Sequence, residues 1–256
     1  MEYQKIRGEK VASLGLGTYR LTGETCVRAV EHALSMGYRH VDTAQMYGNE
    51  AEVGRGIQGA GVERAEIFLT TKVWPSDFAH DRVIRKTRES MKKLRTQYVD
   101  LLLMHWPGEG VPLEETLGAM RELQEDGSVL HVGVSNFSPS LVEEATEYAE
   151  IFCNQVQYHP YRKQDALLRQ AREKDYLLTA YTPLSRGGVQ GDATLRQIGE
   201  AHGKTATQVA LRWLVQQEKV CAIPKATSEE HLRENLDVFD FDLSDEEMQS
   251  ISSLGR

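Results

Sequence analysis

Two apolar runs, Ile67-Phe-Leu-Thr-Thr-Lys-Val73 and Val99-Asp-Leu-Leu-Leu-Met-His-Trp106, lie on either side of a charged, amphipathic stretch from Ala79 to Leu94. Strands that are buried on both faces of a sheet appear in a sequence as such nearly continuous apolar runs, and the stretch between them has the periodicity of a helix. A strand, a helix and a second strand in this order favour two parallel strands joined by a right-handed crossover. This part of the chain therefore predicts an α/β fold.

The same alternation runs through the whole chain of 256 residues. Apolar runs recur roughly every 25–30 residues, with helix-like segments between them. The eight candidate strands are Ser13–Thr18, Arg39–Thr43, Ile67–Val73, Val99–Trp106, Val129–Ser135, Cys153–Tyr158, Leu177–Pro183 and Val220–Pro224. Eight such units in a chain of this length are typical of one closed barrel. We therefore predict a (β/α)₈ TIM barrel over residues 1–256 as a single domain, with an open doubly wound sheet as the alternative.

Helix-start and helix-stop signals add detail to this pattern. Gly127 follows the amphipathic segment Leu113–Asp126, and Ser138-Pro139 is typical of a helix start. Three capping-box patterns are present, namely Thr205-x-x-Gln208, Thr227-x-x-Glu230 and Ser244-x-x-Glu247. The elements expected beyond the eight units are an N-terminal hairpin (Gln4–Ala12), a second helix before the last strand (Thr205–Gln217) and a C-terminal helix from Ser244.

Composition excludes several classes of protein. The formal net charge of −8 is unfavourable for binding a phosphate backbone, so no nucleic-acid partner is expected. The longest apolar stretch, around Leu101 to Met104, is far too short to span a membrane, and the first residues do not form a signal segment. Cys26, Cys153 and Cys221 are scattered, which favours reduced thiols, and Cys153 and Cys221 lie in apolar runs that favour burial. We therefore expect a cytoplasmic protein, and a monomer because no long apolar surface stripe is evident.

Polar side chains follow three neighbouring predicted strands where function gathers in a barrel, at the carboxyl ends. Asp42, Lys72 and His105 occupy these positions, and Tyr47 lies on the loop that leaves the second strand. Taken singly, each has a simpler interpretation: a turn-forming Asp, a packing Tyr, a histidine of the core. Together they predict a site in which a carboxylate, an amine, an imidazole and a phenol converge.

These four groups suit the reduction of a carbonyl. A carbonyl that accepts a hydride needs a proton on its oxygen, and a phenol with its usual pKa of about 10 holds that proton tightly. A nearby ammonium lowers the pKa of a phenol, and Lys72 is placed to do so while Asp42 keeps Lys72 charged. His105 is placed to donate a hydrogen bond to the substrate oxygen.

A long signature connects these residues to a known family. The residues that carry it are Gly37-Tyr38-Arg39-His40-Val41-Asp42-Thr43-Ala44, Tyr47, Asn49-Glu50 and Val53-Gly54. They closely resemble the aldo-keto reductase family, and the resemblance extends from Gly15 to about Asp240, most of all to short bacterial and archaeal members such as aldehyde-reducing and 2,5-diketo-gluconate reductase-like enzymes. It implies a TIM barrel, carbonyl reduction with NADPH or NADH, and Asp42, Tyr47, Lys72 and His105 as the catalytic residues.

The resemblance also implies a set of cofactor-binding residues. Ser135, Asn136 and Gln155 would contact the nicotinamide carboxamide, and Tyr181 would stack on the nicotinamide ring. The loop from Leu184 to Gly188 would cover the pyrophosphate. The segment around the adenosine 2′-phosphate and the adenine would comprise Lys225, Ala226, Thr227, His231, Glu234 and Asn235.

Two positions in the adenosine segment depart from the family pattern. Ala226 stands where a serine is common, and His231 stands where an arginine is usual beside the 2′-phosphate. Arg233 is close in sequence but would project in a different direction from the helix. We therefore expect NADPH as the cofactor, with NADH used as well.

Three aromatic residues, Tyr19, Trp74 and Trp106, are expected to form the walls of a substrate site. The chain ends at Arg256, soon after the last expected helix, and the loop at residues 107–112 is short. We therefore expect an open pocket that accepts small aldehydes, dicarbonyls and keto-sugars.

Two other functions remain as alternatives. One is an NADPH-binding, redox-sensing regulatory protein with little turnover. The other is a metal-dependent barrel hydrolase that uses His40, Asp42, His105 and His159 as ligands. No HxH pair follows the first strand and Lys72 competes for the carboxylate, so no metal is expected.

Overall fold

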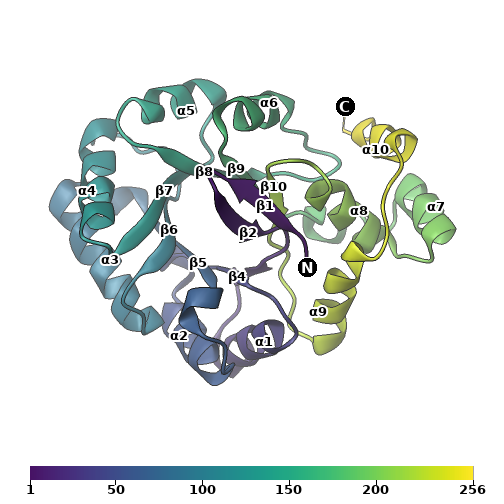
Figure 1. Cartoon of the computed structure of the whole chain (residues 1–256), viewed down its shortest axis with the longest axis horizontal. Helices are drawn as coiled ribbons and strands as arrows, with labels where there is room; N and C mark the ends of the chain where they lie inside the picture. Colours follow the sequence, from purple (N-terminus) through teal and green to yellow (C-terminus); the bar gives the residue numbers. More distant parts are fainter. Residues whose placement is uncertain (256) are drawn as a thin grey trace.

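Eight parallel strands form a ring in the computed structural model, which describes residues 1–255 (Figure 1). The strands are β3 (Leu16–Gly17), β4 (His40–Asp42), β5 (Phe68–Val73), β6 (Val99–Met104), β7 (Val129–Ser135), β8 (Ile151–Gln157), β9 (Leu177–Tyr181) and β10 (Val220–Ala222). Each strand pairs in parallel with the next along the chain. The eight predicted strands are confirmed, although several are shorter than predicted.

The two ends of this sheet meet and close the barrel. Leu14 forms a parallel bridge with Ala222, and the Gly15 amide donates to the carbonyl of Ala222 over 2.8 Å. The Gly17 amide donates to the carbonyl of Pro224 over 3.0 Å. The predicted (β/α)₈ barrel is therefore confirmed, and the alternative of an open sheet is wrong.

Helices surround the ring and extend beyond it on one side (Figure 1). They are α1 (Gly23–Ser35), α2 (Glu50–Gly59), α3 (His80–Leu94), α4 (Leu113–Glu125), α5 (Pro139–Thr146), α6 (Asp165–Lys174), α7 (Ala193–His202), α8 (Ala206–Val215), α9 (Glu229–Leu236) and α10 (Asp245–Ser252). Two helices, α7 and α8, lie between β9 and β10, and α10 follows the last barrel helix, as expected. Across residues 1–255, none of the helices has the length and apolar character needed to cross a bilayer.

Most of the predicted helix signals form. Ser138 caps α5, and both the Thr205 and the Ser244 capping boxes are complete. The capping box predicted at Thr227 is wrong, because α9 begins one residue later than that pattern requires. The Ser228 hydroxyl accepts from the His231 amide over 3.2 Å and takes the capping role. Since both residue types can cap a helix, the local sequence did not distinguish them.

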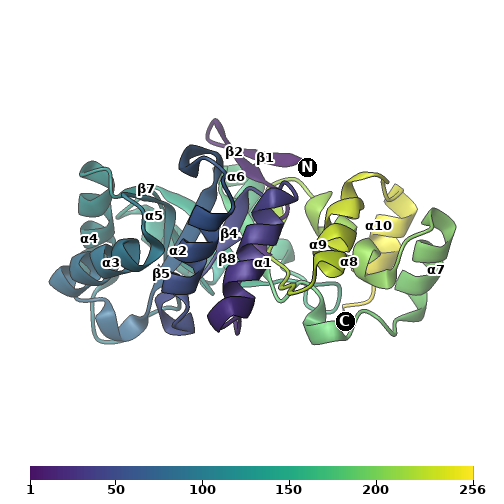
Figure 2. The ribbon, with the colours of Figure 1, turned by 90° about the horizontal axis from the view of Figure 1, so that it is seen from below.

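The N-terminal hairpin closes one end of the barrel (Figures 1 and 2). It consists of β1 (Tyr3–Ile6) and β2 (Glu9–Ala12), which pair antiparallel as predicted. Ile6 and Val11 are fully buried against side chains inside the barrel, among them Leu101 and Leu177 near the starts of their strands. The hairpin therefore covers the amino ends of the strands and leaves the carboxyl ends open.

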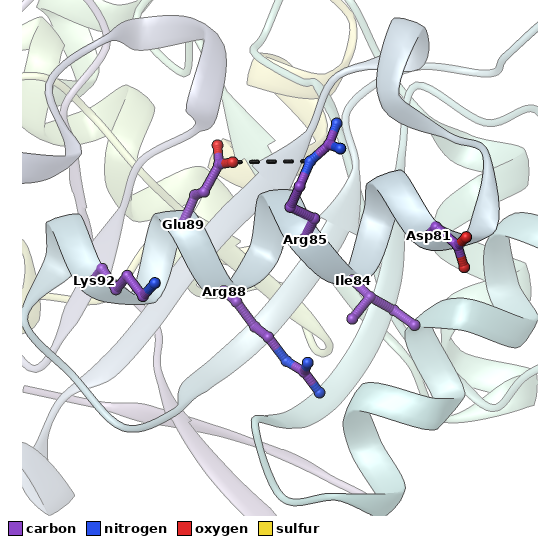
Figure 3. A pocket seen from close by; sticks show the side chains of 6 residues that line it. All are labelled: Asp81, Ile84, Arg85, Arg88, Glu89 and Lys92. Carbon is purple, nitrogen blue, oxygen red and sulfur yellow. Dashed lines mark ion pairs between the residues drawn. The ribbon is translucent and has the colours of Figure 1, made fainter.

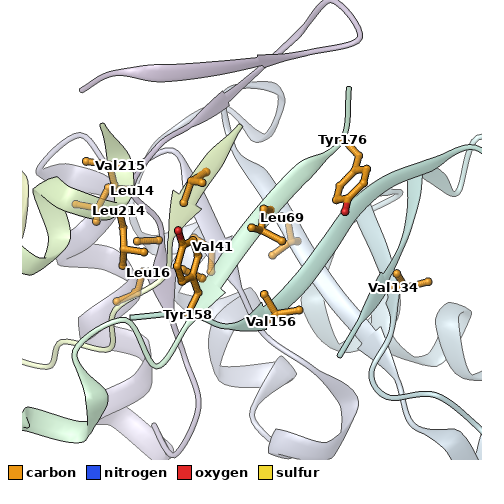
Figure 4. Close-up of a cluster of buried hydrophobic side chains, with 14 of the residues drawn as sticks. Leu14, Leu16, Val41, Leu69, Val134, Val156, Tyr158, Tyr176, Leu214 and Val215 are labelled. Carbon is orange, nitrogen blue, oxygen red and sulfur yellow. The ribbon is translucent and has the colours of Figure 1, made fainter. Parts of the chain in front are cut away.

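A second apolar layer fills the space between the barrel and its helices. Figure 4 shows part of it, with Leu14, Leu16, Val41, Leu69, Val134, Val156, Tyr158, Tyr176, Leu214 and Val215 labelled. Buried apolar surface contributes roughly 25 cal/mol per Å², so this layer is a main source of stability. It holds the strands rigidly and thereby fixes the positions at which they end.

All three cysteines are free, and Cys153 and Cys221 are buried as predicted; Cys26 is buried as well. Thr179 lies between two of them, with its hydroxyl 3.2 Å from the Sγ atoms of both Cys153 and Cys221. Burial raises the pKa of the Cys26 and Cys153 thiols to about 12, so they stay protonated and unreactive.

His40 lies inside the barrel with neither ring nitrogen hydrogen-bonded within the described residues. Its ring packs edge-on against Phe68 with the centroids 5.2 Å apart. Burial lowers the pKa of His40 to about 4, and the neighbouring Asp42 carboxylate only partly opposes this effect. His40 is therefore a neutral core residue at pH 7.

Replacing Gly17 by alanine should test the closure of the barrel. A Cβ atom at Gly17 would lie 2.6 Å from the backbone oxygen of Ile223, which cannot move without disturbing β10. We expect Gly17→Ala to cost about 1–3 kcal/mol in the free energy of unfolding, measured by urea denaturation. Gly118→Ala is the matched control, because nothing lies within 4 Å of the new atom and alanine favours helix α4 by up to about 1 kcal/mol. Equal stability of the two variants would contradict the close approach of β3 and β10.

The burial of His40 predicts a loss of stability in acid. A histidine whose pKa is lowered on folding stabilises the fold fully above its unfolded pKa of about 6.5, and this contribution is lost as the pH falls towards about 4. Between pH 7 and pH 4.5 the wild type should lose about 2 kcal/mol more stability than His40→Phe. Urea denaturation of both proteins at the two pH values measures this difference. The comparison uses only the change in the free energy of unfolding between the two pH values, so a constant difference in stability between the proteins does not affect it. Identical slopes would mean that His40 gains a proton without cost.

Candidate active site

Lys72 and Asp42 form a buried ion pair at the carboxyl ends of β5 and β4. The Lys72 ammonium lies 2.6 Å from Asp42 Oδ1 and donates to the carbonyl of Thr43 over 2.8 Å. The Lys72 side chain has no exposed surface, and that of Asp42 is 2% exposed. A buried ammonium needs such a partner because its transfer out of water is costly. The structure therefore brings together the amine and the carboxylate, as expected.

Tyr47 is placed above this pair by the loop that leaves β4. It ends the short 3-10 helix Gln45–Tyr47, and Gly48 follows with a φ of 68°, in the left-handed region that glycine readily adopts. Asn49 anchors the loop, since its side chain accepts from the Thr43 hydroxyl over 2.9 Å and donates to the carbonyls of Thr18 and Leu21. The Lys72 ammonium lies 3.4 Å from Tyr47 Oη.

The pKa of Tyr47 is shifted in the direction opposite to the one expected from the sequence. Burial raises the pKa of the phenol, and the opposing effect of the Lys72 ammonium does not outweigh it. The expected lowering of the Tyr47 pKa is therefore wrong, because the burial of Tyr47 cannot be read from the sequence. Burial by itself lowers the pKa of Lys72. The Asp42 carboxylate and Tyr47 raise this pKa by more than burial lowers it, so its net shift is upward. Near pH 7 the site thus holds a neutral phenol beside an ammonium.

His105 follows β6 and faces the same mouth. Its ring lies 5.7 Å from the Tyr47 ring and 5.1 Å from the Trp74 ring, edge-on to both. Burial, assisted by the Lys72 charge, lowers the pKa of His105 to about 3, so the imidazole is neutral at pH 7. Nδ1 is buried and has no partner within residues 1–255. An unpaired nitrogen costs less as an acceptor than as an N–H donor, which favours the tautomer with its proton on Nε2.

A hydrogen-bonded network continues from His105 to β7, β8 and β9. The Asn136 amide donates to the His105 carbonyl over 3.1 Å and to the Ser135 hydroxyl over 3.0 Å. The Tyr181 hydroxyl donates to Asn136 Oδ1 over 2.7 Å. Asn136 has a φ of 64°, a conformation that asparagine tolerates better than most residues. The structure thus places the Ser135–Asn136 pair and Tyr181 together at the barrel mouth.

Gln155 has a role that sequence reasoning missed. Its amide nitrogen donates to Asp42 Oδ2 over 2.7 Å, and the residue is 2% exposed. Both oxygens of the Asp42 carboxylate are therefore engaged, one by Lys72 and one by Gln155. The two residues are 113 positions apart, and only the parallel barrel brings their strands to the same interior.

The aromatic residues expected at the substrate site divide into two kinds. Tyr19 is 48% exposed and lies 5.0 Å from the Tyr47 ring, and Trp106 is 44% exposed. Trp74 is half-buried, and it is Trp74 rather than Trp106 that packs against His105. Two aromatic side chains thus rim the mouth, and one supports the histidine from the side.

The loop after β9 has a strained backbone. Thr182, Ser185 and Arg186 have φ values of 52°, 48° and 55°, and Gly187 follows at 92°. A positive φ is unusual for a β-branched residue such as Thr182, and strain of this kind concentrates at ligand-binding segments. Leu184 in this loop is half-buried against the core. The loop predicted to cover a pyrophosphate is thus held in a defined, unusual shape.

The adenosine segment lies beyond β10. Lys225 and Thr227 are exposed, whereas Ala226 and Asn235 are buried. His231 and Glu234 of α9 line a groove of about 460 Å³, together with residues 204–207 and two residues of α7. Part of the predicted adenosine segment therefore borders a hollow large enough for a ligand.

Another hollow lies on the outer surface of α3 (Figure 3). It is lined by Asp81, Ile84, Arg85, Arg88, Glu89 and Lys92, and Arg85 pairs with Glu89 over 3.9 Å. All of these residues come from one helix, and the groups at the barrel mouth are not among them. Within residues 1–255, no three histidine, cysteine, aspartate or glutamate side chains gather as a metal site would require.

Comparison with known proteins agrees with the fold. The model of the aldo/keto reductase family matches residues 13–256, so the chain belongs to this family and is an oxidoreductase that depends on NADPH or NADH. The glyoxal reductase of Bacillus subtilis (strain 168) is 38% identical over 252 residues, covering 97% of this chain and 91% of the relative. The methylglyoxal reductase DkgB of Salmonella typhi is 38% identical over 249 residues, covering 95% and 93%. The crystal structure of a putative 2,5-diketo-D-gluconic acid reductase B superposes with a TM-score of 0.98 at 48% identity, covering all of this chain and 92% of the other.

The residues present fit a nicotinamide dinucleotide. The Asn136 amide and the Ser135 hydroxyl offer donors and acceptors at the mouth, beside the half-buried Tyr181 ring. The strained loop after β9 and the exposed Lys225 after β10 follow neighbouring strands. The groove lined by His231 and Glu234 lies further out on α9. An extended ligand with a polar ring at one end and a charged middle would match the order of these groups, from the mouth through the loop after β9 and Lys225 to the groove at α9.

The ion pair predicts a characteristic pattern of stabilities. We expect Lys72→Met to cost about 3–5 kcal/mol in the free energy of unfolding, because it leaves the Asp42 carboxylate buried without its cation. Adding Asp42→Leu should recover part of this loss, since both charges are then absent. Urea denaturation of the two single variants and the double variant gives the coupling energy. Additive losses would show that the two residues are not coupled.

Proposed function

We propose that this protein reduces small aldehydes and ketones to alcohols with NADPH, and that Tyr47 donates the proton. The observation that carries the proposal is the Tyr47 phenol 3.4 Å from an ammonium that Asp42 holds in place. The similarity to a glyoxal reductase and a methylglyoxal reductase supports small carbonyl compounds as substrates.

The proposed mechanism assigns one task to each residue. When bound, NADPH supplies a hydride to the carbonyl carbon. Tyr47 donates its proton to the carbonyl oxygen, which gains negative charge as the hydride arrives. The Lys72 ammonium stabilises the phenolate that remains, and Asp42 keeps that ammonium in position. His105 donates a hydrogen bond from Nε2 and so orients the carbonyl oxygen towards Tyr47.

The raised pKa of Tyr47 is consistent with the direction of reduction. A phenol whose pKa lies above its usual value is fully protonated near pH 7, so the proton is present when the substrate binds. The neutral His105 is equally suited, because it donates one hydrogen bond without adding a second cation beside Lys72. The site therefore concentrates its positive charge on one group.

Cofactor binding is assigned to residues along the β7–β10 side of the mouth. Ser135 and Asn136 hold the carboxamide, Tyr181 packs on the nicotinamide ring, and Leu184 belongs to the loop over the pyrophosphate. Gln155 both restrains Asp42 and faces the same end of the cofactor. The residues assigned to the adenosine end are Lys225, Ala226, Thr227, His231, Glu234 and Asn235.

The adenosine end favours NADPH without excluding NADH. Lys225 is exposed and offers a full positive charge to the 2′-phosphate. A histidine at position 231 is a weaker partner for a phosphate than an arginine, because an imidazole lacks the planar fork of donors through which a guanidinium binds a phosphate with two hydrogen bonds. We therefore infer that NADPH is preferred and that NADH also supports turnover.

The exposed rim favours varied substrates over one large, closely fitted molecule. Tyr19 and Trp106 present apolar faces to solvent at the mouth. Such walls stabilise apolar parts of a substrate without enclosing it. Small aldehydes, dicarbonyls and keto-sugars are the substrate classes that we assign.

Replacing Tyr47 by phenylalanine tests the proton donor. The variant keeps the ring and loses the transferable proton, so kcat for NADPH-dependent reduction of methylglyoxal should fall by about 10²–10⁴. The Kd for NADPH, measured by fluorescence titration, should not change. Tyr148→Phe is the matched control and should keep wild-type turnover, because Tyr148 lies between the end of α5 and the start of β8, away from the carboxyl ends of the strands.

Three other outcomes would redirect the assignment. Unchanged turnover in Tyr47→Phe would mean that another group donates the proton. Tight NADPH binding without turnover in the wild type would favour the redox-sensing alternative. Loss of activity on treatment with a chelator would favour the alternative of a metal-dependent enzyme.

A further inference from the structure

The groove beyond β10 is built mainly from polar side chains of three helices that stand outside the strand ring (Figure 1). Arg196 and Glu200 come from α7, Thr207 from the first turn of α8, and His231 and Glu234 from α9. Helices α7 and α9 both pack against α8, so the groove has two walls and a floor. Its volume of about 460 Å³ accommodates a flat heteroaromatic ring with its sugar.

The cations at this groove differ in their availability. The Lys204 ammonium is committed, since it donates to Asp240 Oδ2 over 2.7 Å and to the carbonyl of Asp237 over 3.0 Å. The Arg196 guanidinium is exposed, and across residues 1–255 it makes no hydrogen bond or ion pair. Arg196 is thus the uncommitted cation of the groove.

The charges around Arg196 select the kind of group that binds there. Glu200 and Glu234 line the same groove and repel a phosphate. A guanidinium stacks well on the face of a neutral aromatic ring, and a carboxylate accepts a hydrogen bond from an exocyclic amine. Lys225, the residue assigned to the 2′-phosphate, is not among the groove-lining residues. The groove therefore fits the adenine ring and not the phosphate.

We propose that Arg196 is an adenine-binding residue whose guanidinium covers one face of the ring, with His231 on the opposite wall. This inference rests on the proposed function, because it takes the ligand to be a nicotinamide dinucleotide. NADPH and NADH carry the same adenine, so Arg196 contributes equally to both. Lys225 contributes to NADPH alone. Helix α7 thus supplies a cationic contact to the adenine, and this contact serves both cofactors.

Binding measurements with matched variants test the assignment. We expect Arg196→Ala to raise the Kd of NADPH and of NADH by the same factor, roughly 3- to 30-fold. Lys225→Ala should raise the Kd of NADPH and leave that of NADH unchanged. Arg233→Ala is the control, because Arg233 is exposed on α9 outside the groove, and it should change neither value.

A conservative variant separates stacking from charge. Arg196→Lys keeps the positive charge but loses the planar group, so it should bind both dinucleotides nearly as weakly as Arg196→Ala. Full recovery in Arg196→Lys, or a loss confined to NADPH, would overturn the proposal and make Arg196 a phosphate ligand. Wild-type affinities in Arg196→Ala would overturn it as well. If the wild type binds neither dinucleotide, the proposed function fails and this inference fails with it; in every other outcome the proposed function stands.

Discussion

A lysine ammonium without exposed surface is costly in a folded protein, and here the cost is offset by a carboxylate 2.6 Å away. Asp42 is held in turn by the Gln155 amide at its other oxygen. This arrangement ties β4 to β5 and, across the barrel, to β8. The phenol of Tyr47 and the imidazole of His105 are then positioned around a fixed charge, and both are neutral because burial disfavours their ionised forms.

The apolar packing that stabilises the barrel and the polar groups of the site lie in different parts of the fold. The hairpin and the apolar side chains inside the barrel close the amino ends of the strands, and the layer in Figure 4 holds the helices against the ring. Apolar packing therefore fixes the strands from below and from outside. The polar groups that converge on the open mouth lie at the carboxyl ends of the strands, and the packing of the strands fixes their positions.

The elements added to the barrel extend the site beyond this mouth. Helices α7 and α8 between β9 and β10, together with α9, form the groove in which we place the adenine. The strained loop after β9 lies along the chain between Tyr181 at the mouth and α7 at the groove. Under the proposed function, two separate parts of the fold recognise the two ends of the ligand: the strand ends at the mouth and the additional helices.

The sequence by itself determined the order and type of most elements, because the apolar period of a buried strand and the capping residues of a helix are local properties. The signature around Asp42 and Tyr47 also indicated the class of chemistry, since residue types at fixed spacings are visible without coordinates. Only the tertiary structure decided which distant residues lie close together. Gln155 meets Asp42 because a closed barrel brings β8 and β4 to one interior. Arg196 and His231 line the same groove because α7 and α9 both pack against α8. The tertiary structure also decided the net rise in the pKa of Tyr47, because the balance between burial and a neighbouring charge depends on how much water the folded chain excludes.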